Sequence, residues 1–126
     1  MATVLIVDDE QHIRLLIEQA LEELEDDDVQ LLTASDGEEA LDVVANHSPE
    51  LVFLDVMMPK RNGFEVSSAI KADPANAGTT VILLTAKGQA LDREQGAAAG
   101  ADDYLTKPFD PDDLLRRARA ALGLDG

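Results

Sequence analysis

The sequence predicts one α/β domain, in which an open five-stranded parallel sheet carries helices on both faces. Three runs of four consecutive apolar residues, at 4–7, 51–54 and 81–84, are typical of strands buried on both faces. Segments with apolar residues at helical spacing follow these runs, so that strands and helices alternate at intervals of roughly twenty to thirty residues. At 126 residues the chain has the size of one ordinary domain.

Residues 4–7 are the first predicted strand, and they lead directly into two aspartates, Asp8 and Asp9. Residues 11 to about 24 follow as an amphipathic helix with an acidic outer face. Its predicted inward positions are Ile13, Leu16, Ile17, Ala20, Leu21 and Leu24. Residues 29–33 form a shorter strand, and because its flanks are more polar we expect it at an edge of the sheet.

The middle of the chain predicts two further helices around a central strand. Ser35 and Glu38 have the spacing of a capping box, which would open a helix that ends at Ser48-Pro49. Residues 51–54 form the next strand, and Asp55 stands at its exit. Asn62-Gly63 supplies a turn before a short helix over residues 64–72, which Asp73-Pro74 ends.

The last third predicts two strands and two helices. Residues 81–84 form the fourth strand, which exits at Thr85, and residues 89–99 form an alanine-rich helix that Gly100 ends. Residues 104–106 are the fifth strand, which exits at Lys107-Pro108. Asp110-Pro111 then opens an acidic first turn of a final helix, whose inward positions are Leu114, Leu115, Ala118 and Leu122 and which Gly123 ends.

The composition excludes several classes of function. Ten Lys and Arg stand against twenty-six Asp and Glu, so the net charge of −16 should repel nucleic acid and anionic lipid, and we expect a protein partner. There is no cysteine and there are two histidines, so a metal ion would be bound by oxygen. The apolar runs are shorter than a membrane span and the first residues lack a basic region, so we expect a cytoplasmic protein with neither span nor leader.

Five polar side chains stand where predicted strands end, namely Asp8, Asp9, Asp55, Thr85 and Lys107. In parallel sheets ligands bind at the carboxyl ends of the strands. If the first and third strands are neighbours, their carboxylates converge, and two of them about 4 Å apart repel by about 4 kcal/mol at an effective dielectric of about 20. Three such acids require a cation, and an all-oxygen ligand set favours Mg²⁺ over Ca²⁺.

The same residues suit phosphoryl transfer. A metal ion, the Lys107 ammonium and the Thr85 hydroxyl could bind phosphoryl oxygens, and Asp55, alone on the more central strand, is the candidate nucleophile. Each residue taken alone also has a structural interpretation. Asp55 could cap a turn, Asp8 and Asp9 could cap a helix, and Lys107 could be a surface cation.

Four motifs occur in order along the chain, and together they resemble the receiver domain of bacterial two-component response regulators, including the chemotaxis regulators. They are Val7-Asp8-Asp9, Leu54-Asp55-Val56-Met57-Met58-Pro59 with Gly63, Leu84-Thr85-Ala86, and residues 100–109. The resemblance implies a flavodoxin-like receiver fold with strand order 2-1-3-4-5. It also implies a receiver over residues 1–123, with residues 124–126 as a tail or the start of a linker.

The resemblance further implies a role for each site residue. Asp55 would be the phosphoacceptor. Mg²⁺ would be held by Asp9 directly, by Asp8 mainly through water, and by Asp55 and the carbonyl of Met57. Lys107 would pair with Asp55 at rest and with the phosphoryl group afterwards, and the Lys107-Pro108 bond would be cis. Thr85 and Tyr104 would be the switch residues that carry the change to the face formed by the fourth helix, fifth strand and fifth helix.

The implied partners are a sensor histidine kinase or phosphotransfer protein and a downstream output domain or protein. The chain would catalyse only its own phosphorylation and dephosphorylation. Arg116, Arg117 and Arg119 could form a phosphorylation-dependent homodimer surface, although cations near a helix carboxyl end are the favoured interpretation. Two other functions remain open, a binding module that is never phosphorylated and a Mg²⁺-dependent phosphohydrolase that uses an aspartyl phosphate.

The chain departs from the family pattern at a few positions. Lys60-Arg61-Asn62 stands where many receivers have a small residue and an acid, and Thr80 stands where a proline often precedes the fourth strand. Met57 and Lys87 occupy positions that tune the lifetime of the acyl phosphate in the family. That lifetime therefore stays open.

Overall fold

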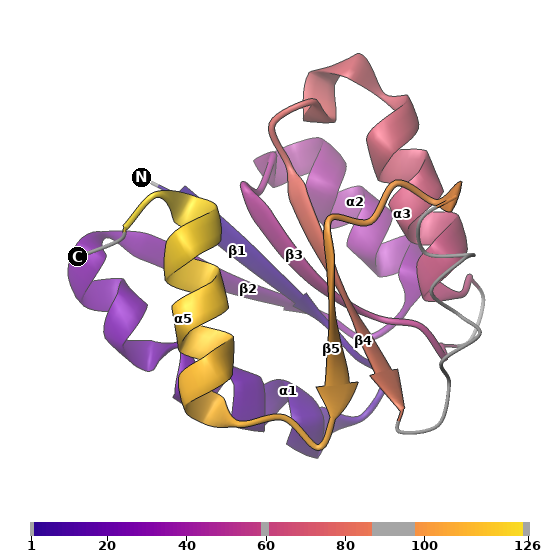
Figure 1. Cartoon of the computed structure of the whole chain (residues 1–126). Coiled ribbons are helices and arrows are strands. Elements are labelled where there is room, and N and C mark those ends of the chain that lie inside the picture. The colour runs from indigo at the N-terminus through magenta and orange to yellow at the C-terminus, as the bar shows by residue number, and fades with distance from the viewer. Residues whose placement is uncertain (1, 59–60, 87–97, 125–126) are drawn as a thin grey trace.

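A computed structural model describes residues 2–58, 61–86 and 98–124, and these residues form a parallel sheet between two layers of helices (Figure 1). The strands run in the order β2-β1-β3-β4-β5, as the resemblance implied. Their bounds are β1 Ala2–Val7, β2 Val29–Ala34, β3 Leu51–Asp55, β4 Thr80–Ala86 and β5 Asp103–Lys107. The prediction that residues 29–33 form an edge strand is confirmed.

The register of the strands brings their carboxyl ends to one level. Val7 of β1 pairs with Ala34 on one side and with Leu54 on the other, so Asp8 lies level with Asp55. From β1 the chain crosses to β2 in one direction and then returns past β1 to β3, so the order of the strands reverses between β1 and β3. A reversal of this kind leaves a crevice at the carboxyl ends of the two strands.

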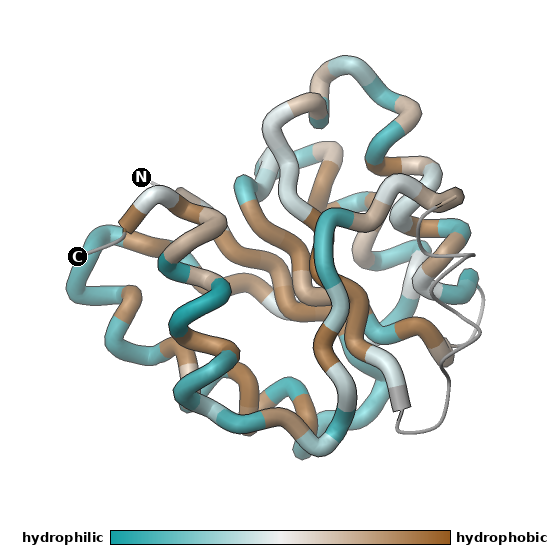
Figure 2. The backbone as a smooth tube through the Cα atoms, viewed as in Figure 1, coloured by the Kyte–Doolittle hydropathy of each residue, from teal (hydrophilic) through white to brown (hydrophobic). Residues whose placement is uncertain are grey.

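Two apolar cores lie on opposite faces of the sheet, because alternate side chains of a strand point to opposite faces. Val4 and Ile6 pack beneath α1 (Gln11–Ala20) and α5 (Pro111–Leu122), whereas Leu5 and Val7 pack beneath α2 (Gly37–His47) and α3 (Gly63–Ala72). The central strands form the continuous hydrophobic band in Figure 2. Burial on both faces explains why these strands read as unbroken apolar runs.

The first helix ends earlier than predicted. α1 stops at Ala20, and a 3₁₀ helix, η1 (Glu22–Asp27), continues the chain. Leu21 and Leu24 are buried as expected, but Leu16 is 41% exposed, so its inward assignment was wrong. The inward stripe runs through Ile13, Ile17 and Leu21 at intervals of four, and Leu16 lies about 100° away from that stripe.

The predicted cap of the second helix is displaced by one residue. Asp36, and not Ser35, is the N-cap of α2, and its carboxylate accepts a hydrogen bond from the Glu39 amide at 2.8 Å. The Glu39 carboxylate in turn accepts from the Ser35 amide at 2.6 Å. The reason is local, because Asp36 is the extended residue directly before the helix and its side chain reaches the third helical amide.

The other helix ends agree closely with the sequence. Asn62 and Glu65 form a complete capping box at the start of α3, and Asp110 caps α5. Gly100 and Gly123 have φ angles of 80° and 71°, the left-handed conformation expected after a helix. A short 3₁₀ helix, η2 (Pro74–Asn76), follows α3.

Some predictions lie outside the described residues. These are the helix over 89–99 except for its last two residues, and the positions Pro59, Lys60 and Lys87. Among the helices that the structure describes, none combines the length and the apolarity that crossing a membrane requires.

Candidate functional site

The ends of three strands bring two carboxylates and one ammonium group together. Lys107 Nζ, at the end of β5, lies 2.9 Å from Asp8 Oδ2 and 3.3 Å from Asp55 Oδ1. Asp8 is fully buried and Asp55 is 5% exposed. Lys107 pairs with Asp55, as the resemblance implied, and Asp8 is its closer partner.

Burial and neighbouring charges shift the pKa values of Asp55 and Lys107. Burial raises the pKa of Asp55 to about 6, the neighbouring Asp8 carboxylate adds to the rise, and Lys107 opposes it. Burial alone would lower the pKa of Lys107, but its hydrogen bond to Asp8 and the charge of Asp55 outweigh burial, and the pKa is raised. At pH 7 Asp55 is therefore mainly ionised, and Lys107 carries its positive charge.

The backbone and the carboxylate of Asp8 are both hydrogen-bonded. Its amide donates to the Ala34 carbonyl at 3.2 Å, and its Oδ1 accepts from the Glu10 amide at 2.9 Å. Its own carbonyl accepts from Arg14 Nη1 at 2.7 Å. Arg14 is not among the site residues predicted from the sequence. A cation in the opening turns of a helix, where the helix dipole disfavours it, is the signal that points to it.

An acidic cluster lies where β1 leads into α1. Carboxylate oxygens of Asp8, Asp9 and Glu10 lie within 4.8 Å of one another, and Asp9 and Glu10 are exposed. An all-oxygen, strongly anionic donor set suits a hard divalent cation that keeps part of its water, so the residues present fit Mg²⁺. Asp8 and Asp9 are among the metal ligands predicted from the resemblance, whereas Glu10, which comes directly before α1, is not.

Met57 follows Asp55 at the mouth of the site. Its side chain is 64% exposed, and its amide lies 3.4 Å from Asp55 Oδ1 as a hydrogen-bond donor. The predicted role of its carbonyl as a metal ligand stays a prediction.

Thr85 and Tyr104 lie on adjacent strands. Thr85 is 8% exposed, and its hydroxyl donates to the Leu105 carbonyl at 3.5 Å, across to β5. Tyr104 is half-buried and packs against the core on the α2 and α3 face of the sheet. Asp55 pairs with Leu84, so Thr85 stands one residue beyond the level of Asp55. The Lys107-Pro108 bond is cis, as the resemblance implied.

Gly63 shapes the segment that follows Asp55. Its amide donates to the Val56 carbonyl at 2.9 Å and so closes the loop from β3 to α3. A Cβ atom at this position would lie 2.4 Å from the carbonyl oxygen of Asp55, a distance that real Cβ atoms essentially never show. Only glycine therefore fits this close approach without a shift of the backbone at Asp55.

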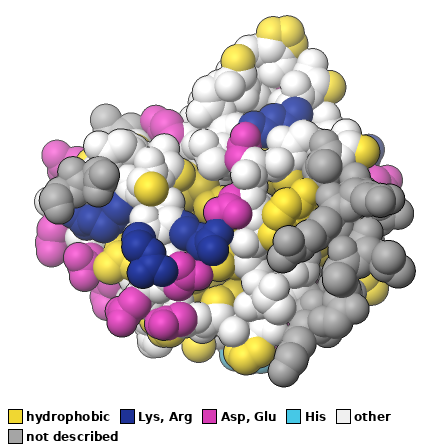
Figure 3. Space-filling model, viewed as in Figure 1, with side chains coloured by type: hydrophobic (Ala, Val, Ile, Leu, Met, Phe, Trp, Pro, Cys, Tyr) yellow, Lys and Arg dark blue, Asp and Glu magenta, His cyan; other side chains and the backbone are white. Residues whose placement is uncertain are grey.

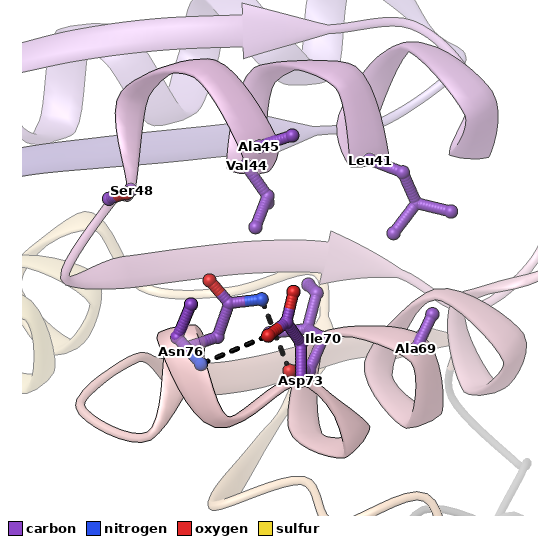
Figure 4. A pocket seen from close by; sticks show the side chains of 9 residues that line it. Leu41, Val44, Ala45, Ser48, Ala69, Ile70, Asp73 and Asn76 are labelled. Atoms are coloured by element: carbon purple, nitrogen blue, oxygen red, sulfur yellow. Dashed lines mark hydrogen bonds between the residues drawn. The ribbon is translucent and has the colours of Figure 1, made fainter.

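A separate hollow of about 220 Å³ lies between α2 and the end of α3 (Figure 4). Apolar side chains, among them Leu41, Val44 and Ile70, line much of it. The polar side chains at its rim bind within the chain, because the Asn76 amide group donates to the Ile70 carbonyl and Asp73 accepts from the Ala75 amide. The hollow is therefore a feature of side-chain packing, unlike the cluster of charged groups at the strand ends.

Comparisons with known proteins agree with this geometry. The family described as the response regulator receiver domain matches residues 4–119. The probable transcriptional regulator ycf27 of Guillardia theta is 45% identical over 94% of this chain and 44% of its own length. The phosphate regulon regulatory protein PhoB of Pseudomonas aeruginosa is 40% identical over 98% of this chain and 53% of its own. The chain thus spans about half the length of the curated relatives it matches.

Solved structures are similar over nearly the whole chain. A putative response regulator from Chloroflexus aurantiacus superimposes with a TM-score of 0.87 at 31% identity, covering 97% of this chain and 98% of that one. A receiver domain described as BeF3-activated DrrB has a TM-score of 0.85 at 35% identity, with 98% of each chain covered. The chemotaxis response regulator CheY4 of Vibrio cholerae has a TM-score of 0.84 at 33% identity, covering 96% and 98%.

Proposed function

The chain belongs to the family of response regulator receiver domains, and on that premise we propose that it is the phosphoacceptor of a two-component phosphorelay, with Asp55 as the residue phosphorylated. The observation that carries the proposal is the ammonium of Lys107 between the buried carboxylates of Asp8 and Asp55, at the point where the strand order reverses. The donor would be the phosphohistidine of a sensor kinase or phosphotransfer protein.

Asp55 acts as the nucleophile. One of its carboxylate oxygens attacks phosphorus in line, the phosphorus–nitrogen bond of the phosphohistidine breaks, and the electron pair returns to the imidazole nitrogen. With a pKa of about 6, Asp55 is ionised at pH 7, as the attack requires. Water later attacks the same phosphorus and restores the carboxylate with release of inorganic phosphate. The chain performs both steps on itself only.

Lys107 and Thr85 receive the phosphoryl group. The Lys107 ammonium already lies beside Asp55 and would move from the carboxylate to a phosphoryl oxygen. The Thr85 hydroxyl points to the Leu105 carbonyl and would have to leave it to donate to another phosphoryl oxygen. We propose this exchange, with a movement of Tyr104 into the space that Thr85 vacates, as the switch.

Magnesium is the proposed cofactor. Asp9 and Asp55 would bind it directly, Asp8 mainly through water, and Met57 through its carbonyl, with Glu10 close enough to add its charge. When bound, the ion neutralises charge that builds up on the phosphoryl oxygens.

The output would be a change in partner binding at the face formed by the fourth helix, β5 and α5. The relative PhoB is described as a transcriptional regulatory protein. We propose that the receiver, over residues 1–123, acts on an output domain or a separate output protein, and that this segment does not itself bind nucleic acid. The absence of nucleic-acid binding follows from the net charge of −16 on the whole chain.

The test is incubation with acetyl phosphate, with and without Mg²⁺, followed by intact mass spectrometry. We expect a gain of one phosphoryl group that requires both Mg²⁺ and Asp55, so Asp55→Asn should gain none. No gain in a folded wild-type protein that binds Mg²⁺ would reject phosphorylation and favour the pure binding module. Sustained turnover of small phosphate esters would instead favour the phosphohydrolase.

A further inference from the structure

Arg14 reaches back from α1 to the end of β1. Its Nη1 donates to the Asp8 carbonyl at 2.7 Å, and its side chain is half-buried. This carbonyl belongs to the peptide that joins Asp8 to Asp9, so the contact acts on the backbone between two acidic residues. Neither the predicted roles nor the family comparison assigns a function to Arg14.

The position of Arg14 is unfavourable for the helix that carries it. Arg14 is the fourth residue of α1, close to the end where the helix dipole is positive and cations are disfavoured. The first turn carries no acid to offset it, and Glu10 caps the helix without a side-chain hydrogen bond. A residue that breaks a local rule in this way is expected to serve something other than the helix itself.

The contact completes the restraint of Asp8. The carboxylate of Asp8 is bound by the Glu10 amide and by Lys107, and its amide by the Ala34 carbonyl. Among the described contacts, Arg14 is the only charged donor to the Asp8 carbonyl. Without Arg14, this carbonyl would lose that hydrogen bond. The peptide between Asp8 and Asp9 could then rotate, and rotation would turn the Asp9 carboxylate away from Asp8.

We propose that Arg14 is a positioning residue, which fixes the peptide between Asp8 and Asp9 so that the acidic cluster of Asp8, Asp9 and Glu10 is aimed at one divalent cation. The proposal rests on the proposed function of the site. Because Arg14 is itself a cation, its charge alone would weaken the binding of Mg²⁺, whereas its positioning role strengthens it. The two effects have opposite signs, so measurement can separate them.

The experiment compares Mg²⁺ affinity by calorimetry in wild type and in Arg14→Gln. Loss of a partner that orients metal ligands costs 10- to 100-fold in affinity, and we expect a loss of about tenfold. Arg14→Lys, which keeps the charge and one donor, should restore part of the affinity. Arg116→Gln is the matched control, because Arg116 is exposed on α5 and contacts only Asp113 among the described contacts. It should bind Mg²⁺ like wild type.

A second readout needs no metal. Amide exchange at Asp9 and Glu10 in metal-free protein should become faster in Arg14→Gln, while exchange in β3 and β4 stays unchanged. Arg14→Met, which keeps the apolar stem, repeats both measurements if the glutamine variant does not fold. Equal or tighter Mg²⁺ binding in either variant would overturn the proposal. If wild type itself neither binds Mg²⁺ nor accepts a phosphoryl group, the proposed function fails, whereas the exchange data still report on Arg14.

Discussion

At the scale of single residues, the folded chain holds an unfavourable excess of negative charge at the site. Asp8 and Asp55 share one ammonium group, so the trio carries an excess negative charge in a buried place. Burial, and after it the Asp8 carboxylate, raises the pKa of Asp55, and Lys107 offsets only part of the rise. A divalent cation, or a phosphoryl group with its cation, would offset this negative charge, which supports the proposed binding of both.

The raised pKa of Asp55 predicts a pH-dependent stability. The folded chain holds a proton on Asp55 up to a pH of about 6, whereas an unfolded chain releases it near 4, so between these values stability falls as pH rises. Asp55→Asn removes the titration. In metal-free buffer we expect it to raise the free energy of unfolding by about 1 to 3 kcal/mol at pH 7 to 8.

Urea denaturation from pH 4 to pH 8 measures this difference. The advantage of Asp55→Asn should shrink as the pH falls from about 6 towards 4, because the wild-type carboxyl group becomes neutral there. A difference that is constant over the whole range would contradict the assigned cause.

Gly63 gives a second prediction at this scale. In Gly63→Ala the new methyl group would collide with the Asp55 carbonyl, so we expect a loss of about 1 to 3 kcal/mol of stability and slower phosphorylation of Asp55. Gly78→Ala is the matched control, since a Cβ at Gly78 meets nothing within 4 Å. The control should stay within about 0.5 kcal/mol of wild type. Thermal melts measure the stability of the two variants, and the rate of reaction with acetyl phosphate measures their phosphorylation. Equal stability and equal rates in the two variants would refute the steric argument.

At the scale of elements, α5 is bound to its neighbours by ion pairs. Arg117 pairs with Asp103 of β5 and Asp113 of its own helix, and Arg119 with Glu23 and Asp27 of η1. Figure 3 shows the Lys and Arg side chains of this face among Asp and Glu side chains. Burial by itself would lower the pKa of Arg117, but its carboxylate partners Asp103 and Asp113 outweigh burial, and the pKa is raised. Arg117 and Arg119 therefore bind acids within the chain, and of the three arginines only Arg119 stands in the last turn of α5, where a helix carboxyl end favours a cation.

The ion pairs predict the oligomeric state. Because the cations of α5 already have partners within the chain, we expect the receiver to sediment as a monomer both before and after phosphorylation. Sedimentation velocity with acetyl phosphate and Mg²⁺, and with Asp55→Asn as the unphosphorylated control, measures this. A doubling of mass that requires Asp55 would instead assign the face of β5 and α5 to a homodimer.

At the scale of the whole molecule, the sheet connects the site to a distant surface. Thr85 is the last residue but one of β4 and Lys107 is the last residue of the adjacent strand β5, and the Thr85 hydroxyl donates to the Leu105 carbonyl of β5. β2 lies at the opposite edge, with β1 and β3 between. A change at the proposed phosphoryl group would therefore reach β5 directly, whereas two strands, β1 and β3, separate β2 from β4.

This arrangement predicts which parts of the sheet change their amide exchange on phosphorylation. Amide exchange near Thr85 and over β5 should change on phosphorylation, while exchange in β2 should not, because only the former would contact the proposed phosphoryl group. Hydrogen exchange with mass spectrometry on phosphorylated wild type and on Asp55→Asn checks this. Unchanged exchange around Thr85 and Lys107 would reject the two-state switch.

The sequence by itself determined the strands, most helix ends and the residues that stand at strand ends. These are local properties, since apolar runs, caps and glycines act within a few residues. The order of the strands came only through the resemblance. Local patterns misplaced the cap at Ser35 and the end of the first helix, because neighbouring residues there could serve equally well.

Only the tertiary structure decided which side chains meet. Lys107 lies 99 residues from Asp8 in the chain, and its preference for Asp8 over Asp55 depends on strand register and on small differences in side-chain position. The closeness of Gly63 to the Asp55 carbonyl and the contact of Arg14 with the Asp8 carbonyl are likewise distances between atoms in space. Periodicity reports which face a residue takes, but it carries no information on the packing that sets such distances.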